Sequence, residues 1–257
     1  MTDHADAFEP DLPNPGQATS FGPAAALYEK GRPSYPAEVV DWLVPEGATH
    51  VVDLGAGTGK FTRLLVAKGL HVAAVEPSAG MRDELIRAVP GAQVLPGSAE
   101  RLPIDGESVD AVLAAQSWHW VDPARAVPEV ARVLRPGGTL GMVWNMRARD
   151  DGWLDELDVL LEKANGASVV ESGDPTVGAP FGPVEKAEFA WVNRVPHDDV
   201  IAMVASRSYV ITRPDDQRAA ILGEVRELLE THPATRGRAL VDIPYVAKAS
   251  RTRLLPS

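Results

Sequence analysis

The residues best suited to chemistry lie in the segment VVDLGAGTGKF, residues 51–61. An apolar run leads to Asp53, and glycines then occupy positions 55, 57 and 59. Because glycine has no side chain, such a loop lets the backbone approach a ligand closely and adopt conformations that other residues avoid. The carboxylate of Asp53 would repel an incoming pyrophosphate and attract a positive charge. The loop therefore favours a ligand that carries a cationic group and no phosphate.

Two phosphate-binding patterns resemble this loop, and both fail. A Walker loop needs a glycine five positions before its Gly-Lys-Ser/Thr sequence; here that position holds Leu54, and Phe61 follows Lys60. A dinucleotide fingerprint reads G-x-G-x-x-G/A, and its third small residue, counted from Gly55, would fall on Lys60. The Walker pattern fails at two positions, whereas the dinucleotide fingerprint fails at only one. A nicotinamide-dependent oxidoreductase therefore stays open as an alternative.

A second group of candidate residues lies in QSWHWVD, residues 116–122. If this segment is extended, Trp118 and Trp120 share one face and His119 points the other way. The two tryptophans then either fill the core or line a site, and His119 is either structural or a substrate contact and base. The other histidines lack the paired spacing of metal ligands, so we expect no metal site; they are His4, His50, His71, His197 and His232.

Composition limits the functional class. The formal net charge of −11 opposes the electrostatic grip on phosphate backbones that nucleic-acid binders need. The absence of cysteine excludes disulfides, thiolate zinc sites and a cysteine nucleophile. Residues 1–20 are acidic and proline-rich without the apolar stretch of a signal peptide, and no uncharged apolar run approaches the ~20 residues of a membrane span. We therefore expect a cytoplasmic protein that binds neither nucleic acid nor membranes.

The elements that must position these residues alternate along the first half of the chain. Short apolar runs predict buried strands, and amphipathic segments between them predict helices, a pattern that indicates a parallel sheet covered on both faces. We expect the helix before residue 134 to begin near Val127, with DPARA as a separate turn, because Pro128 fits best at a helix start. The predicted strands cover residues 50–54, 71–76, 92–95, 109–115 and 139–144.

The second half is less regular. An acidic segment at 151–164 predicts an amphipathic surface helix, and a Gly/Ser-rich loop follows at 165–183. Strands are predicted at 186–195 and 241–251, with helices around 197–231 between them. We find no repeat and no hinge-like linker, so we expect a single domain.

Several segments together resemble the class I S-adenosylmethionine-dependent methyltransferases. The glycine loop resembles the first motif of that family, and Glu76 follows Asp53 at the distance where the family places an acid on both ribose hydroxyls. GSAERLP (97–103) resembles the loop beside adenine, although Ser98 stands where the family often has aspartate. The resemblance implies an α/β, doubly wound, Rossmann-like and mostly parallel seven-stranded sheet. The cofactor-binding residues it implies are Asp53, Gly55, Ala56, Gly57, Thr58, Gly59, Glu76, Pro77, Met81, Ser98, Ala99, Glu100 and Gln116.

A narrower resemblance involves YEKGRPSYP (28–36) and QSWHWVD. Both are similar to segments of the small-molecule methyltransferases typified by trans-aconitate methyltransferase, which implies methyl transfer to a carboxylate, thiol or hydroxyl. Arg32 would then clamp an anionic acceptor or contact the carboxylate of the cofactor, and His119 would act as a base if the nucleophile is a hydroxyl. The substrate-side residues implied are Tyr28, Arg32, Tyr35, Trp118, Trp120, Trp144, Asn145 and Tyr209.

The resemblance also implies an organisation. We expect a disordered tail at 1–20 and a methyltransferase domain at 21–257. The domain would comprise lid helices at 21–48, a cofactor-binding core at 49–146, and a variable substrate-side half at 147–257 that holds the last two strands. S-adenosylhomocysteine would be the product, and we expect a monomer or weak homodimer. A non-catalytic cofactor-binding protein stays open as a further alternative.

Overall fold

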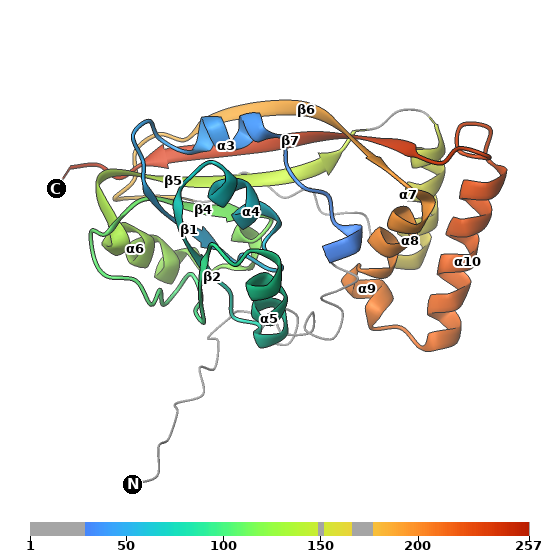
Figure 1. Cartoon of the computed structure of the whole chain (residues 1–257), viewed down its shortest axis with the longest axis horizontal. Coiled ribbons are helices and arrows are strands. Elements are labelled where there is room, and N and C mark those ends of the chain that lie inside the picture. Colours follow the sequence, from blue (N-terminus) through green and yellow to red (C-terminus); the bar gives the residue numbers. More distant parts are fainter. Residues whose placement is uncertain (1–28, 149–151, 166–176, 257) are drawn as a thin grey trace, which may run out of the picture.

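A computed structural model describes residues 29–148, 152–165 and 177–256. Its centre is a seven-stranded sheet with the strand order β3-β2-β1-β4-β5-β7-β6 (Figure 1). The first five strands are parallel, whereas β7 runs antiparallel to both β5 and β6. This is the predicted doubly wound, mostly parallel sheet. The strands are β1 (His50–Leu54), β2 (His71–Val75), β3 (Gln93–Leu95), β4 (Val109–Ala115), β5 (Leu134–Arg147), β6 (Glu185–Val195) and β7 (Val241–Arg253).

Helices cover both faces of the parallel part, because alternate strand residues point to opposite sides. On one face Val51 and Leu113 pack with Leu43 and Phe61. These last two belong to α3 (Ala37–Leu43) and α4 (Lys60–Ala67), and α5 (Ala79–Ala88) contacts β3 beside them. The apolar strands are therefore buried on both sides.

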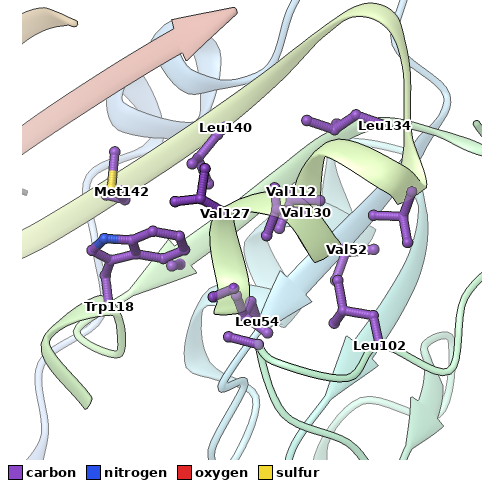
Figure 2. Packing of buried hydrophobic residues seen from close by; sticks show 14 of the residues in the cluster. Val52, Leu54, Leu102, Val112, Trp118, Val127, Val130, Leu134, Leu140 and Met142 are labelled. Carbon is purple, nitrogen blue, oxygen red and sulfur yellow. The ribbon is translucent and has the colours of Figure 1, made fainter. Parts of the chain in front are cut away.

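The opposite face is covered by α6 (Pro123–Val133). Its Val127 and Val130 pack against Val52 and Val112 of the central strands, as Figure 2 shows. Leu140 and Met142 of β5 continue the same cluster. The core of the parallel half thus lies directly beneath the carboxyl ends of β1 and β4.

The helix α6 begins earlier than predicted. Asp122 precedes it and accepts a hydrogen bond from the Ala124 amide at 3.0 Å, and Pro123 occupies the first turn, where no intrahelical partner is needed. Pro128 lies inside the helix. The expectations of a start near Val127 and of a separate turn over DPARA were therefore wrong, because the Asp-Pro pair supplies a better helix start.

The strand β5 is also longer than predicted. It begins at Leu134, ahead of the predicted start at residue 139, and runs through the Pro-Gly-Gly sequence. Leu134 pairs with Val109, and the register then shifts before Ala111 pairs with Thr139. The sequence Pro-Gly-Gly therefore forms an irregularity within the strand rather than a turn outside it.

The second half builds a helical group at one end of the sheet. The strands β5, β6 and β7 extend beyond the parallel core, and Figure 1 shows α7 to α10 gathered at that end. Leu157, Val204 and Leu229 of these helices pack with Ile243 and Tyr245 of β7. The helices are α7 (Trp153–Asn165), α8 (His197–Ala205), α9 (Ser208–Ile211) and α10 (Asp215–Thr231). Among the helices of the described ranges, none is both long and apolar enough to cross a membrane.

Candidate functional site

The site lies where the order of the strands reverses. The first strand, β1, pairs with β2 on one side and with β4 on the other. The chain leaves the carboxyl ends of β1 and β4 in loops that therefore flank a crevice, which is where open α/β sheets bind their ligands. The loop after β1 is the glycine loop, and the segment after β4 is QSWHW.

The glycine loop needs its glycines for two reasons. Gly55, Gly57 and Gly59 have φ angles of 68°, 56° and 92°, a region that side chains disfavour. A Cβ at Gly55 would come within 2.6 Å of the Cβ of Ser117, because the segments after β1 and β4 touch there. Gly59 ends the loop as the residue before α4 and packs against Leu85 instead of facing a pocket.

Two pockets open around this loop. The small pocket, of about 250 Å³, extends from the glycine loop over Glu76 towards the loop at 98–100. The large pocket, of about 650 Å³, extends the other way towards the ends of β5 and β7. They share the lining residues Arg32, Gly55, Gly57, Ala115, Gln116 and His119. A ligand in one pocket therefore lies next to a ligand in the other.

Glu76 forms the polar centre of the small pocket. Its Oε2 accepts a hydrogen bond from the Gly57 amide at 3.0 Å, and its Oε1 accepts one from the Ser78 amide at 2.9 Å. The side chain is 6% exposed, and burial raises its pKa despite these two donors. A carboxylate offers about four lone-pair sites, so two acceptor positions remain for a ligand's hydroxyl groups.

Asp53 lies beneath the loop, and only one of its oxygens is satisfied. Its Oδ2 accepts a hydrogen bond from the Thr62 hydroxyl at 2.5 Å, whereas its buried Oδ1 has no partner among the described residues. Burial, and to a lesser extent the charge of Glu76, raise the pKa of Asp53 to about 7. A cationic ligand group in the large pocket, which Asp53 lines, would favour the ionised form of this buried carboxyl group.

The far wall of the small pocket comes from the loop at 98–100. Ser98, Ala99 and Glu100 are all buried there. Glu100 Oε1 accepts a hydrogen bond from the Asp122 amide at 2.9 Å, which ties this loop to the start of α6. Pro77 and Met81 complete the wall. The predicted adenine-side residues therefore share one pocket with Glu76.

Gln116 and His119 lie at the junction of the two pockets. Gln116 has a φ of 57°, unusual for a residue with a side chain, and its Nε2 donates to the Asn145 carbonyl at 3.1 Å. Strained backbone of this kind persists where the surrounding structure enforces it, often at functional sites. The strain here turns the chain sharply at the end of β4 and brings His119 over the junction.

His119 is held in one orientation. The Trp144 indole N–H donates to its Nδ1 at 3.3 Å, which assigns the proton of a neutral ring to Nε2. Desolvation by the surrounding protein and the positive charge of Arg32 lower the pKa of His119. The imidazole is therefore neutral near pH 7, but the nitrogen that could accept a proton already accepts one hydrogen bond.

A strap, defined here as residues 29–36, crosses the junction from the other side. Glu29 Oε2 accepts a hydrogen bond from the Thr58 hydroxyl at 2.6 Å, which fastens the strap to the glycine loop. Its other oxygen lies 3.1 Å from the Nη2 of Arg63 and 3.7 Å from the Nζ of Lys60. Figure 1 shows this segment (blue) between the parallel core and the helices α8 and α9.

The strap also delivers predicted residues to the large pocket. Arg32 and Tyr35 line it, and the Tyr35 ring meets the Phe61 ring edge-on at a centroid distance of 5.2 Å. Asn145 Nδ2 donates to the Ser34 carbonyl at 2.8 Å, so the end of β5 anchors the strap. Trp144 and Asn145 line the same pocket.

Three of the predicted residues that the structure describes line neither pocket. Trp118 is 3% exposed within the core cluster beside Met142 (Figure 2), because residues 118–120 form a 3₁₀ turn instead of the expected extended segment. Trp120 does face the small pocket, and its ring is tilted by 46° against the His119 ring at a centroid distance of 4.8 Å. Gly59 and Tyr209 line neither pocket, and Tyr28 lies outside the described residues.

The large pocket holds functional candidates that sequence reasoning missed. Arg147 and Asp158 form an ion pair there, Arg207 follows α8, and the Tyr245 hydroxyl donates to the Met203 sulfur at 3.5 Å. Only Arg147 carried a signal, since it lies at the end of a strand that leads to the crevice. Within the described part of the chain, no three residues of metal-binding type gather into a metal site.

Comparisons with known proteins agree with one another. A family model described as a methyltransferase domain matches residues 52–142. An uncharacterized methyltransferase of Mycobacterium tuberculosis is 50% identical over 240 residues, which cover 91% of this chain and 96% of the relative. A solved structure described as a type II methyltransferase of Anaeromyxobacter dehalogenans has a TM-score of 0.66 at 26% identity, covering 88% of this chain and 99% of that one. The Haemonchus contortus phosphoethanolamine N-methyltransferase 2, solved with S-adenosylhomocysteine, shares the fold with a TM-score of 0.51 at 12% identity, covering 94% of this chain and 59% of that one.

Proposed function

Because the chain belongs to the class I S-adenosylmethionine-dependent methyltransferases, we propose that it methylates a carboxylate, thiol or hydroxyl of a small molecule held in the large pocket. The observation that carries this proposal is the pair of pockets that meet at Gln116 and His119. One pocket has the groups that suit a nucleoside, and the other has room for an acceptor. Their shared boundary places the two ligands side by side.

The residues of the small pocket fit the cofactor. Glu76 keeps two acceptor positions for the vicinal ribose hydroxyls, and the buried loop at 98–100 offers a flat wall for the adenine ring. The buried carboxyl group of Asp53, which lines the adjoining large pocket, would attract the positive charge of the ammonium group of the methionine part. Because Gly55 and Gly57 have no side chains, the cofactor could lie directly against the backbone between these points. These residues would hold the cofactor across the junction.

When bound, S-adenosylmethionine supplies a methyl group on a sulfonium, which is already a good leaving group. The protein must then align the acceptor and exclude water, a contribution worth about 7–11 kcal/mol in favourable cases. The strap closes over the junction through Glu29 and Asn145, and Trp120 and His119 wall its other side. These residues would wall the junction on two sides and limit the access of water to the transfer.

The acceptor side is selective for charge. Arg32 lines both pockets at their junction, where its guanidinium can hold a carboxylate through two parallel hydrogen bonds. A carboxylate or thiolate nucleophile needs no base. A hydroxyl nucleophile would need His119 to release Nδ1 from Trp144 before that nitrogen accepts a proton. The geometry therefore favours an acceptor that is already ionised.

The proposal is tested by incubating the full chain with radiolabelled S-adenosylmethionine and a panel of small carboxylic acids, thiols and phenols. Transfer of label to a member of the panel supports it. Binding of S-adenosylhomocysteine by calorimetry without transfer to any member would remove the acceptor classes named here. Failure to bind S-adenosylhomocysteine at all would remove the assignment of the small pocket.

Replacing Glu76 with glutamine should weaken S-adenosylhomocysteine binding by at least about tenfold. The substitution removes one charged acceptor, and a hydrogen bond to a charged group contributes ~1.5–3 kcal/mol, where 1.4 kcal/mol is a factor of ten. Glu84→Gln on α5, which lines neither pocket, is the matched control and should bind normally. Calorimetry provides the dissociation constants. Equal affinity in Glu76→Gln and the wild type would refute the ribose assignment.

Replacing Arg32 with alanine should raise the KM for an anionic acceptor by at least about tenfold, because a charged hydrogen bond of the size given above is lost. The dissociation constant of S-adenosylhomocysteine should change much less. Steady-state kinetics and calorimetry separate the two effects. A variant that loses cofactor affinity while its acceptor KM is unchanged would instead assign Arg32 to the cofactor.

A further inference from the structure

Two arginines occupy the end of the large pocket that lies away from the glycine loop. Arg147 is the last residue of β5, and Arg207 lies between α8 and α9. Arg147 therefore ends the part of β5 that extends toward the helical group, and Arg207 belongs to that group itself, which Figure 1 shows at the extended end of the sheet. The methyl transfer proposed above takes place at the other end, beside Gln116 and His119.

Arg207 lacks a compensating charge of its own. Within the described ranges it forms no ion pair, and its buried Nε has no hydrogen-bond partner. Burial, followed by the positive charge of Arg147, lowers the pKa of Arg207 to about 10. A desolvated guanidinium in this condition reduces stability unless an anion meets it.

The positive charge of Arg147 is only partly neutralised by its neighbours. Its Nη2 forms an ion pair with Asp158 of α7, but its buried Nη1 has no partner among the described residues. Asp158 is also the carboxylate within electrostatic range of Arg207, so two guanidinium groups share one acid. Glu162 adds a second carboxylate, but it is exposed at the rim and screened by water. Arg32, Tyr209 and Tyr245 are the other titratable groups that act on Arg207, and the positive charge of Arg32 lowers its pKa further.

We propose that Arg147 and Arg207 form an anion subsite, which binds a second carboxylate or phosphate group of the acceptor at a distance from the group that is methylated. This inference rests on the proposed function, because it assigns the substrate class of the same pocket. Arg32 would hold the reacting end and the subsite the remote end. An acceptor with two anionic groups would bind Arg32 with one of them and the subsite with the other.

The subsite explains a contrast in charge. The whole chain carries a formal charge of −11, which repels anions at long range. Three arginines nevertheless line this one pocket, and the other cation there, Lys60, lies beside Glu29. Guanidinium groups bind carboxylates and phosphates through paired hydrogen bonds, so they select for these groups and for their orientation. Selectivity for a dianion is the expected consequence.

The test compares three probes by calorimetry with the full chain saturated by S-adenosylhomocysteine: succinate, its monoamide succinamate, and inorganic phosphate. Succinate should bind at least about tenfold more tightly than succinamate, and Arg207→Met should abolish that preference. Arg226→Gln, an exposed arginine on α10, is the matched control and should retain it. Phosphate binding that Arg207→Met removes would assign the subsite to phosphate-bearing acceptors, and succinate preference alone would assign it to dicarboxylates.

A second measurement separates binding from a purely structural role. Since Arg207 is desolvated without an ion pair, Arg207→Met should leave the melting temperature unchanged or raise it. A lowered melting temperature with an unchanged preference for succinate would show that Arg207 supports the fold, and would overturn the subsite. The subsite would also be overturned if the wild type binds none of the probes at millimolar concentration. Because S-adenosylhomocysteine binding is measured first, failure of the proposed function is distinguishable from failure of the subsite.

Discussion

Gly57→Val is expected to abolish binding of S-adenosylhomocysteine. Gly57 has a φ of 56°, lines both pockets, and donates its amide hydrogen to Glu76. A valine there would place two methyl groups at the junction of the pockets and force the backbone out of the left-handed region, which breaks the contact with Glu76. Calorimetry with S-adenosylhomocysteine should detect no binding, while circular dichroism should retain the secondary structure.

The matched control for this variant is Gly47→Val. Gly47 has a φ of 77°, and no atom within 4 Å would meet its Cβ. Valine there therefore introduces comparable backbone strain at an exposed turn that lines neither pocket. Gly47→Val should lower the melting temperature and bind S-adenosylhomocysteine normally. If Gly57→Val binds as well as Gly47→Val does, the glycine loop does not form the floor of the cofactor pocket.

The parallel half of the fold could be predicted because its signals are local. Buried strands such as 50–54 and 109–115 are short, mostly apolar runs, each with one aspartate, and both were predicted with the bounds that the structure has. The boundary of α6 was missed because the Asp122–Pro123 pair outweighs the helix-breaking tendency of Pro128. Local competition of this kind decides where elements begin, which is why bounds are less predictable than the elements themselves.

The small pocket was predictable for a related reason. Its residues follow the ends of successive parallel strands, so the order of the sheet alone brings Gly57, Glu76 and Ser98 together. Trp118 was placed less well, since an extended segment and a 3₁₀ turn point its ring in different directions. One turn therefore decides that Trp118 packs in the core and Trp120 faces the pocket.

The large pocket could be predicted only in part, since Arg32 was expected on the substrate side but Arg147, Arg207 and Tyr245 were not. Arg32, Arg147, Arg207 and Tyr245 come from four distant segments, and only the packing of α7 to α10 on the extended strands brings them together. Arg207 follows no motif and ends no strand. Its buried Nε, which has no hydrogen-bond partner among the described residues and suggests a ligand, exists as such only in the folded chain. Sites of this kind depend on tertiary packing rather than on spacing.

The strap links the two pockets mechanically. It touches the glycine loop through Glu29 and Thr58, the end of β5 through Ser34 and Asn145, and the helical group through Gly31. A Cβ on Gly31 would lie 2.4 Å from the backbone of α8, at Ala202 and Met203. Gly31 is therefore the point where the strap lies directly on the substrate-side helices, with no room for a side chain.

Gly31→Ala should consequently lower kcat/KM for the acceptor by about 10²-fold, because displacing the strap by even ~1 Å misaligns Arg32 and opens the junction to water. S-adenosylhomocysteine affinity should fall by less than about tenfold, since Glu76 and the glycine loop remain in place. Gly223→Ala on α10, whose Cβ would meet nothing within 4 Å, is the matched control and should keep full activity. Kinetics and calorimetry on both variants decide the matter. If Gly31→Ala has wild-type kinetics, the contact between the strap and α8 does not hold the acceptor site in place. If Gly31→Ala loses more turnover than Arg32→Ala does, the strap contributes more to catalysis than Arg32 alone.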